Sequence, residues 1–153
     1  MLTVSDGVAA GTREDASGEA VAALLAEHGY EVVERAHCAD GQEPVAAALR
    51  RLAAGFAGLV VTTGGTGFGP RDLTPEATVA VIERSAPGLA EAMRAASPLG
   101  PLSRGVAGTV GTCLVLNTPG SPAGAVESLR AVLEVLPHAL ALLAGEHHPH
   151  PPA

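Results

Sequence analysis

The feature that most constrains the fold is a glycine-rich run placed directly between a buried strand and the start of a helix. Residues 59–62, Leu-Val-Val-Thr, form a short apolar stretch that predicts a buried strand. The run 63–72, Thr-Gly-Gly-Thr-Gly-Phe-Gly-Pro-Arg-Asp, follows at once. Thr74 and Pro75 then predict the N-cap and the first residue of a helix. Such a loop leaves backbone N–H groups free to face an anion, so the run predicts a phosphate-binding site.

Strands and helices are expected to alternate along the rest of the chain. Helices are expected at 17–28, 40–55, 74–84, 87–97 and in a long apolar segment that contains Pro137 and ends at Gly145. Strands are expected at 2–5, 30–36 and 58–62, and residues 106–110 and 112–116 form either a hairpin or one interrupted strand. This alternation predicts a three-layer α/β/α fold with a mainly parallel sheet.

The length of the chain, 153 residues, fits one domain with a sizeable core. No linker-like stretch or internal repeat divides the sequence. We therefore expect a single domain over residues 1–145 and a disordered tail over residues 146–153. His147, His148 and His150 lie among prolines in that tail, which favours a disordered end over a metal site.

The charged residues exclude several kinds of chemistry. All nine basic residues are arginine, so a Walker phosphate loop and a lysine Schiff base are both ruled out. A net charge of −7 without a basic stripe argues against nucleic acid as a partner. An anionic substrate would therefore require Mg²⁺ or a local group of arginines. No apolar run reaches the ~18 residues of a membrane helix and no signal peptide is recognisable, so we expect no membrane contact and a cytoplasmic location.

Polar residues follow several of the expected strands, where ligands bind in parallel sheets. Asp6 and Asp15 flank the loop after the first strand, and each either lines a site or caps a turn or helix. Asp40, with Glu43 three residues later, is either a ligand-binding carboxylate or part of a capping box. Asp72 is either a metal ligand or a helix-start residue favoured by the helix dipole. The N-cap of a helix is the favoured role of Ser17, and ligand binding is the less favoured one.

Several motifs together resemble a known family. They are the run 63–78, the opening segment 2–6, Asp-Ala-Ser-Gly at 15–18, Leu-Ser-Arg at 102–104 and Asn-Thr-Pro-Gly-Ser-Pro at 117–122. Across nearly the whole chain the sequence resembles the molybdenum cofactor biosynthesis family, which includes bacterial molybdopterin adenylyltransferases and the N-terminal domain of gephyrin.

The resemblance implies an enzyme that transfers AMP from ATP to the terminal phosphate of molybdopterin. It also implies Mg²⁺, a homotrimer, contact with the downstream molybdenum-insertion enzyme, and a sheet with one antiparallel edge strand. Two alternatives stay open. One is a non-catalytic molybdopterin-binding or scaffold trimer of the same family, and the other is a nucleotide-cleaving relative.

The resemblance also assigns roles to residues. Asp40 and Asp72 are expected to be catalytic and to hold Mg²⁺, although Ala39-Asp40-Gly41 departs from the family's Pro-Asp-Glu. Ser5 and Asp6 are candidates for the nucleotide side. Arg104 is expected either to contact phosphate or to be solvated. The residues expected to bind substrate or phosphate are Gly64, Gly65, Thr66, Gly67, Phe68, Arg71, Ser103, Asn117, Pro119, Gly120 and Ser121.

Overall fold

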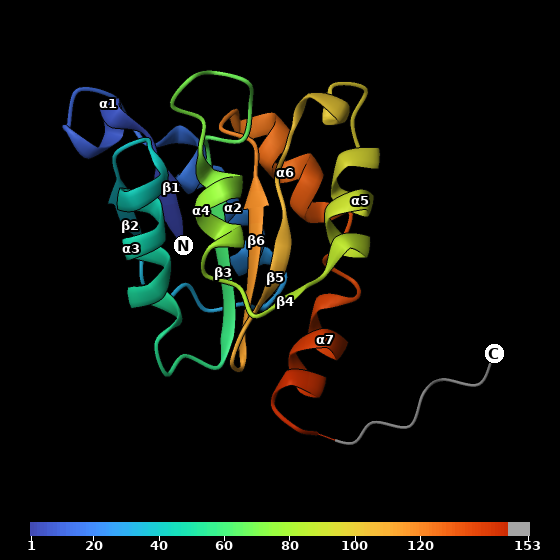
Figure 1. Cartoon of the computed structure of the whole chain (residues 1–153). Coiled ribbons are helices and arrows are strands. Elements are labelled where there is room, and N and C mark those ends of the chain that lie inside the picture. The colour runs from blue at the N-terminus through green and yellow to red at the C-terminus, as the bar shows by residue number, and fades with distance from the viewer. Residues whose placement is uncertain (147–153) are drawn as a thin grey trace.

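The computed structural model describes residues 1–146, where a six-stranded sheet lies between two layers of helices (Figure 1). The strands are β1 (Leu2–Val4), β2 (Ala36–Cys38), β3 (Gly58–Thr63), β4 (Arg84–Ser85), β5 (Ala107–Val110) and β6 (Cys113–Thr118). The helices are α1 (Asp6–Ala9), α2 (Ala16–Glu27), α3 (Gln42–Ala53), α4 (Thr74–Val79), α5 (Pro87–Ala95), α6 (Pro122–Arg130) and α7 (Leu136–Leu143), with a 3₁₀ turn, η1, at Gly100–Leu102. His147, His148 and His150, in the tail that we expect to be disordered, lie outside the described residues.

The sheet has the strand order β2-β1-β3-β6-β5-β4. β1 pairs in parallel with both β2 and β3, and β3 pairs in parallel with β6. The chain passes from β1 outward to β2 and then crosses back to β3 on the other side of β1. The strand order therefore reverses between β1 and β3, which is the position where ligands bind in open α/β sheets.

One strand runs against the others. β5 is antiparallel to β6 on one side and to the two-residue β4 on the other. β5 and β6 form a hairpin, so the second of the two arrangements expected for 106–116, one interrupted strand, is wrong. The prediction of a mainly parallel sheet with antiparallel pairing at one edge is confirmed. The reversed strand itself lies one place inside that edge, with β4 outermost.

Small aliphatic side chains fill the core on both faces of the sheet, as the aromatic content of 2% requires. One cluster joins α2, α5 and α6 to the sheet through residues such as Leu25, Met93 and Leu129. The other joins α3 and α4 to the opposite face through Leu49 and Ala77. The three-layer prediction is thus confirmed. No helix within residues 1–146 is both long enough and apolar enough to cross a bilayer.

Two expected elements have different bounds. In the strand expected at 30–36, residues 30–35 have no regular secondary structure, because β1 pairs on this side only with Ala36–Cys38. The helix expected at 74–84 ends at Val79, where the carbonyl of Thr78 accepts two amides and the chain turns into β4. There the amide of Glu83 bonds across to β5 instead of continuing the helix.

Two predicted helix caps are wrong for a common reason. Ser17 lies inside α2, and its hydroxyl is 2.9 Å from that of Thr63 on β3. Asp15 is the N-cap instead and accepts the amide three residues later. Thr74 is the first residue of α4, and its hydroxyl donates to the carbonyl of Gly64 at 2.9 Å. In both places the hydroxyl bonds to a distant segment, which local sequence spacing does not reveal.

Candidate functional site

The carboxyl ends of the parallel strands meet at one edge of the sheet, drawn at the top of Figure 1. Ser5 directly follows β1, Gly64 follows β3 and Pro119 follows β6. Asp40 comes two residues after β2. Segments that are far apart in the sequence are therefore brought together around the point where the strand order reverses.

Two adjoining hollows lie at this edge. The large hollow, of about 660 Å³, is bounded by the glycine loop, η1 and the start of α6. The small hollow, of about 330 Å³, is bounded by the segments after β1 and the starts of α2 and α6. Gly65, Gly120 and Ser121 line both hollows and form a ridge between them, which we call the shared ridge. Two ligands bound in these hollows would be separated only by the three residues of the shared ridge.

Glycine is required where the backbone of the loop turns beneath this ridge. Gly64 has φ +95° and Gly65 has φ +63°, conformations that L side chains rarely adopt. A Cβ on Gly64 would overlap the carbonyl oxygen of Val4, and one on Gly65 would overlap the hydroxyl of Thr74. Gly120 packs so closely on Gly64 that its Cβ would lie 3.2 Å from the Gly64 Cα. The shared ridge is thus backbone packed on backbone.

Arg104 braces the glycine loop. Its Nε donates to the carbonyl of Gly67 at 2.7 Å, and its other nitrogens bond to the Glu76 carboxylate and to the carbonyl of Asp72. The guanidinium also lies over the ring of Phe68, 5.8 Å from its centroid. The hydrogen bond from Arg104 lowers the pKa of Glu76. Arg104 is therefore a brace of the loop that lies outside the large and small hollows, with its side chain 30% exposed. Its expected contact with phosphate stays a prediction.

Asp72 ends the glycine loop on the wall of the large hollow. Its Oδ2 accepts the amide of Gly69 at 2.8 Å, which closes the loop on itself. The helix that follows begins at Thr74, and no side chain caps it. The carboxylate therefore faces the loop and the hollow rather than serving as a helix-start residue.

Asp6 and Asp40 tie together the segments after β1 and β2. Oδ2 of Asp40 accepts the Asp6 amide at 2.9 Å, and Oδ1 of Asp6 accepts the Asp40 amide at 3.1 Å. Arg71 donates to Oδ1 of Asp6 at 2.9 Å and to the carbonyl of Asp40 at 2.8 Å. α3 begins after Gly41 without a side-chain cap, so the capping-box interpretation of Asp40 is wrong. Asp40 instead lines the small hollow.

Most residues expected to bind substrate do line a hollow. Thr66, Gly67, Ser103 and Pro119 line the large hollow, Ser5 and Gly64 line the small one, and the three residues of the shared ridge line both.

Four expected residues line neither hollow. The Asn117 side chain is buried and donates to the hydroxyls of Thr62 and Thr78, so it braces the sheet from inside. Phe68 is 72% exposed on the outer side of the loop. The side chains of Asp6 and Arg71 pair with each other.

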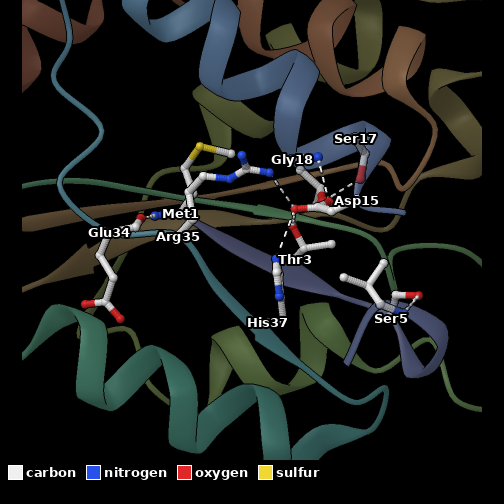
Figure 2. A network of polar contacts seen from close by, with 11 residues as sticks. Met1, Thr3, Ser5, Asp15, Ser17, Gly18, Glu34, Arg35 and His37 are labelled. Carbon is white, nitrogen blue, oxygen red and sulfur yellow. Dashed lines mark hydrogen bonds and ion pairs between the residues drawn. The ribbon is translucent and has the colours of Figure 1, made fainter. Parts of the chain in front are cut away.

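Asp15 anchors the wall of the small hollow from behind. Figure 2 shows Thr3 of β1, His37 of β2 and Arg35, just before β2, pointing toward its carboxylate. Oδ2 lies 3.0 Å from the Thr3 hydroxyl, 3.0 Å from an Arg35 nitrogen and 3.1 Å from His37 Nε2. Burial alone would raise the pKa of Asp15, but the amide of Gly18 and these partners lower it. With its side chain only 7% exposed, Asp15 is a cap and an anchor.

Sequence reasoning did not single out some residues that line the hollows. Arg13 and Glu14 belong to the wall of the small hollow, and Leu99 and Leu102 belong to the rim of the large one. Arg13 had a detectable signal, since it is a cation in the loop after the first strand of a parallel sheet. Leu99 and Leu102 are 71% and 57% exposed in a proline-rich link, where no periodic pattern marks them.

Residues 1–138 match a family described as "Probable molybdopterin binding domain". The chain belongs to the molybdenum cofactor biosynthesis family. The two hollows and the braced glycine loop are therefore features of a member of this family.

Similar proteins extend over almost the whole chain. The molybdopterin biosynthesis enzyme MoaB from Thermus thermophilus is 48% identical, with a TM-score of 0.89 and coverage of 95% of this chain and 94% of that one. The tungsten cofactor synthesizing protein MoaB from Pyrococcus furiosus is 31% identical, with a TM-score of 0.79 and 93% coverage of each chain. The molybdopterin adenylyltransferase of Helicobacter pylori is 36% identical over 96% of this chain and 88% of that protein.

Proposed function

We propose that this protein is a Mg²⁺-dependent molybdopterin adenylyltransferase. In this reaction a terminal phosphate oxygen of molybdopterin attacks the α-phosphorus of ATP. The bond between the α-phosphorus and the bridging oxygen breaks, and pyrophosphate leaves with that oxygen. The products are adenylylated molybdopterin and pyrophosphate.

The observation that carries the proposal is the pair of hollows separated by the shared ridge. A transfer between two phosphorylated molecules requires their phosphates to be held in line and close together. The ridge offers the backbone of Gly65 and Gly120 and the start of α6, where Ser121 is the N-cap. Helix N-termini and glycine backbones favour anions, so the ridge suits the two reacting phosphates.

The linings of the hollows suggest which substrate each one takes. The exposed Leu99 and Leu102 border the large hollow, together with the polar Thr66 and Ser103. Apolar walls with a few polar groups suit a flat heterocycle, so we assign the large hollow to the pterin. We assign the small hollow, which Ser5 and Asp40 line, to the nucleotide.

Mg²⁺ fits the donors that the two hollows provide. Among residues 1–146 no three histidine, cysteine or acidic side chains form a group that could hold a metal by themselves. Mg²⁺ is usually held by one or two carboxylates together with substrate phosphates and water. We assign Asp40 and Asp72 to this role, since each lines one hollow beside the shared ridge. When bound, Mg²⁺ would supply positive charge to the phosphates of the nucleotide.

The chain's own residues bind and orient the substrates. The amides of the glycine loop and the start of α6 hold the phosphates, and Arg104 keeps the loop in place through its bonds to Gly67 and Asp72. No lysine is available to form a covalent adenylyl-lysine intermediate. Rate enhancement then comes from alignment of the two substrates and from fixed dipoles.

A binding-only role is the second candidate, and one observation favours it. Oδ2 of Asp40 is already occupied by the amide of Asp6 at 2.9 Å, and Asp40 and Asp72 line different hollows. If neither carboxylate turns toward a shared ion, the protein would bind molybdopterin without transferring AMP. This is the non-catalytic binding or scaffold protein of the same family.

The deciding experiment is incubation of the protein with molybdopterin, ATP and Mg²⁺, followed by measurement of pyrophosphate. We expect pyrophosphate only when all three are present, and we expect Asp72→Asn to abolish its release while molybdopterin still binds. Glu91→Gln, which removes an exposed carboxylate on α5 outside both hollows, serves as the control and should keep activity. Wild-type binding of molybdopterin without pyrophosphate release would favour the binding-only role.

A second variant separates the role of Asp40 in the reaction from its role in the fold. Asp40→Ala removes the bond to the Asp6 amide, so we expect a stability loss of about 1–2 kcal/mol. We expect much less pyrophosphate per folded molecule. Normal turnover of the folded fraction would contradict the proposed Mg²⁺ role.

The remaining parts of the proposal rest on the family resemblance. We propose a homotrimer, a cytoplasmic location and transient contact with the enzyme that inserts molybdenum. Sedimentation equilibrium would test the first of these, since a trimer has three times the 15.2 kDa mass of the chain. A monomer at micromolar concentration would contradict it.

A further inference from the structure

We propose that Arg13 binds the phosphate chain of the nucleotide in the small hollow, and that the buried Asp15 presents it there. The proposal rests on the function proposed above, because it takes the small hollow as the nucleotide side. It adds the cation that a triphosphate requires and that the glycine loop does not supply.

Both arginines that were expected from the sequence to contact phosphate, Arg71 and Arg104, already bond to other residues of the protein. Arg71 bonds to Asp6 and to the carbonyl of Asp40, and Arg104 bonds to the glycine loop and Glu76. Neither lines the large or the small hollow. The sequence contains no lysine to replace them.

Arg13, in contrast to Arg71 and Arg104, lines one of the two hollows, and its guanidinium has no partner within the described residues. It lines the small hollow, and it is the one arginine, lysine or histidine of residues 1–146 that does so. The described part of the chain gives its guanidinium no hydrogen bond and no ion pair, although Glu14 and Asp40 line the same hollow. A guanidinium pairs well with phosphate oxygens because it offers several donors in a fixed plane.

Two helix starts converge on the same hollow. Ala16 and Ser17 bring the N-terminus of α2, which has 12 residues, and Ser121 and Pro122 bring that of α6, which has 9. Asp15 accepts one amide of α2 and Ser121 accepts one amide of α6, and the amides that these caps leave free carry partial positive charge. The small hollow therefore combines a cation and two helix N-termini in a protein of net charge −7.

The backbone around Arg13 is fixed at both ends. On one side the amides of Thr12 and Arg13 both donate to the carbonyl of Gly7, at 2.9 and 3.1 Å, and the Arg13 side chain packs against Gly7. On the other side, two residues along, Asp15 is held by Thr3, Arg35 and His37, as Figure 2 shows. The guanidinium of Arg13 thus has no partner within the described residues, and it projects from a turn whose backbone is fixed. The fixed backbone lowers the conformational entropy that is lost when Arg13 binds a ligand. Asp15 acts through Arg13 and is a positioning residue.

The test is titration calorimetry of the full-length protein with Mg-ATP, inorganic pyrophosphate and adenosine. We compare wild type, Arg13→Gln, Arg13→Lys and the control Arg130→Gln, which removes an exposed arginine at the end of α6, outside both hollows. We expect Arg13→Gln to weaken Mg-ATP and pyrophosphate about tenfold or more while adenosine affinity stays unchanged. Arg13→Lys should recover part of the loss, and the control should match wild type.

Asp15→Asn tests the positioning role, since asparagine keeps the helix cap but loses the charge that holds Arg35 and His37. We expect it to weaken Mg-ATP less than Arg13→Gln does, and to add nothing when combined with Arg13→Gln. Additive losses would contradict positioning through Arg13.

The outcomes separate this inference from the proposed function. Mg-ATP binding that is equal in wild type and Arg13→Gln overturns the role of Arg13 and leaves the adenylyltransferase proposal standing. Arg13-dependent binding of pyrophosphate without binding of ATP supports an anion site but contradicts the nucleotide substrate. Equal losses for Mg-ATP and adenosine in Arg13→Gln would show a general structural effect and also overturn the inference.

Discussion

The large and small hollows share a ridge but are built in different ways. The wall of the large hollow is the glycine loop, which is closed by Asp72 and braced from outside by Arg104. The wall of the small hollow includes the segments that follow β1 and β2, which are joined by hydrogen bonds of Asp6, Asp15 and Asp40. The wall of the large hollow is closed within one loop that a single distant residue braces, whereas the wall of the small hollow depends on several contacts between distant parts of the chain.

The two hollows also differ in what they offer a ligand. The large hollow has exposed leucines at its rim and no arginine in its lining, whereas the small hollow has Arg13. A ligand in the large hollow gains from burial of apolar surface and from backbone amides. An anionic ligand in the small hollow gains binding free energy from the positive charge of Arg13. Variants that change one property should therefore affect one hollow, and variants of the shared ridge should affect both.

The largest effect is expected from Gly64→Ala, beneath the shared ridge. The new Cβ would sit at φ +95° and overlap the Val4 carbonyl, so β1 and the loop would have to separate. We expect a loss of about 4 kcal/mol in the free energy of unfolding. Binding to both hollows should be lost in the folded fraction. Urea unfolding measures the stability change.

The matched control is Gly111→Ala in the β5–β6 turn. Gly111 also has positive φ, +54°, but its Cβ would meet nothing within 4 Å. We expect a loss of about 1 kcal/mol from backbone strain alone. Equal losses for the two variants would show that the close packing beneath the ridge contributes nothing.

The next effect is expected from Arg104→Gln, which removes the brace of the glycine loop. Glutamine cannot replace the simultaneous bonds to Gly67, Asp72 and Glu76, so we expect a loss of about 2 kcal/mol in unfolding free energy. Molybdopterin affinity should fall more than Mg-ATP affinity, because the brace supports the wall of the large hollow. Arg84→Gln, which removes one hydrogen bond to Thr109, is the control. Equal weakening of both ligands would contradict the separation of the two walls.

A smaller effect is expected at the rim of the large hollow. Leu102 is 57% exposed and would be covered by a ligand, so Leu102→Ala should weaken molybdopterin by about 1.4 kcal/mol, or about tenfold. Mg-ATP affinity should not change. Titration calorimetry measures both affinities, and Leu142→Ala on α7, at a site of similar exposure (51%), is the control. A change in Mg-ATP affinity with no change for molybdopterin would reverse the assignment of the hollows.

The difference between the hollows also explains what the sequence could predict. The glycine loop was recognisable because its strand, glycines and helix start are contiguous, and the parallel sheet followed from the alternation of elements. Ser103, Gly120 and Ser121 were expected at the site, and all three line a hollow. The glycine loop and the sheet were predicted from local patterns and from the rule that parallel strands end at one edge, whereas these three residues were expected from the family resemblance.

Predictions failed where a polar side chain bonds to a distant segment. Ser17 and Asp40 have the sequence context of helix caps, yet they bond to Thr63 and Asp6. Asn117 is in a turn motif, yet its amide is buried against Thr62 on the next strand. A capping motif and a tertiary hydrogen bond require the same side chains, so spacing alone does not distinguish them.

The smallest effect is expected from pH, and it concerns only the wall of the small hollow. The folded protein lowers the pKa of Asp15, so the stability it contributes is fully present above the unfolded pKa, near 4, and is lost as pH falls through the lower folded pKa. Asp15→Asn should remove this part of the acid sensitivity. We expect wild type to be more stable than the variant by about 1 kcal/mol at pH 6, and we expect this difference to shrink as the pH falls below the unfolded pKa of about 4.

Urea unfolding of both proteins at pH 6, 5, 4 and 3 measures the difference in their free energies of unfolding. The contributions of the other carboxyl groups cancel in this difference. Ser97→Ala, which removes one hydrogen bond and no titratable group, is the control and should keep a constant difference from wild type. If Asp15→Asn also keeps a constant difference, the ionised carboxylate does not hold Arg35 and His37, and the wall of the small hollow is held by the helix cap alone. The contrast between a locally closed wall and one joined by distant contacts would then have to rest on Asp6 and Asp40.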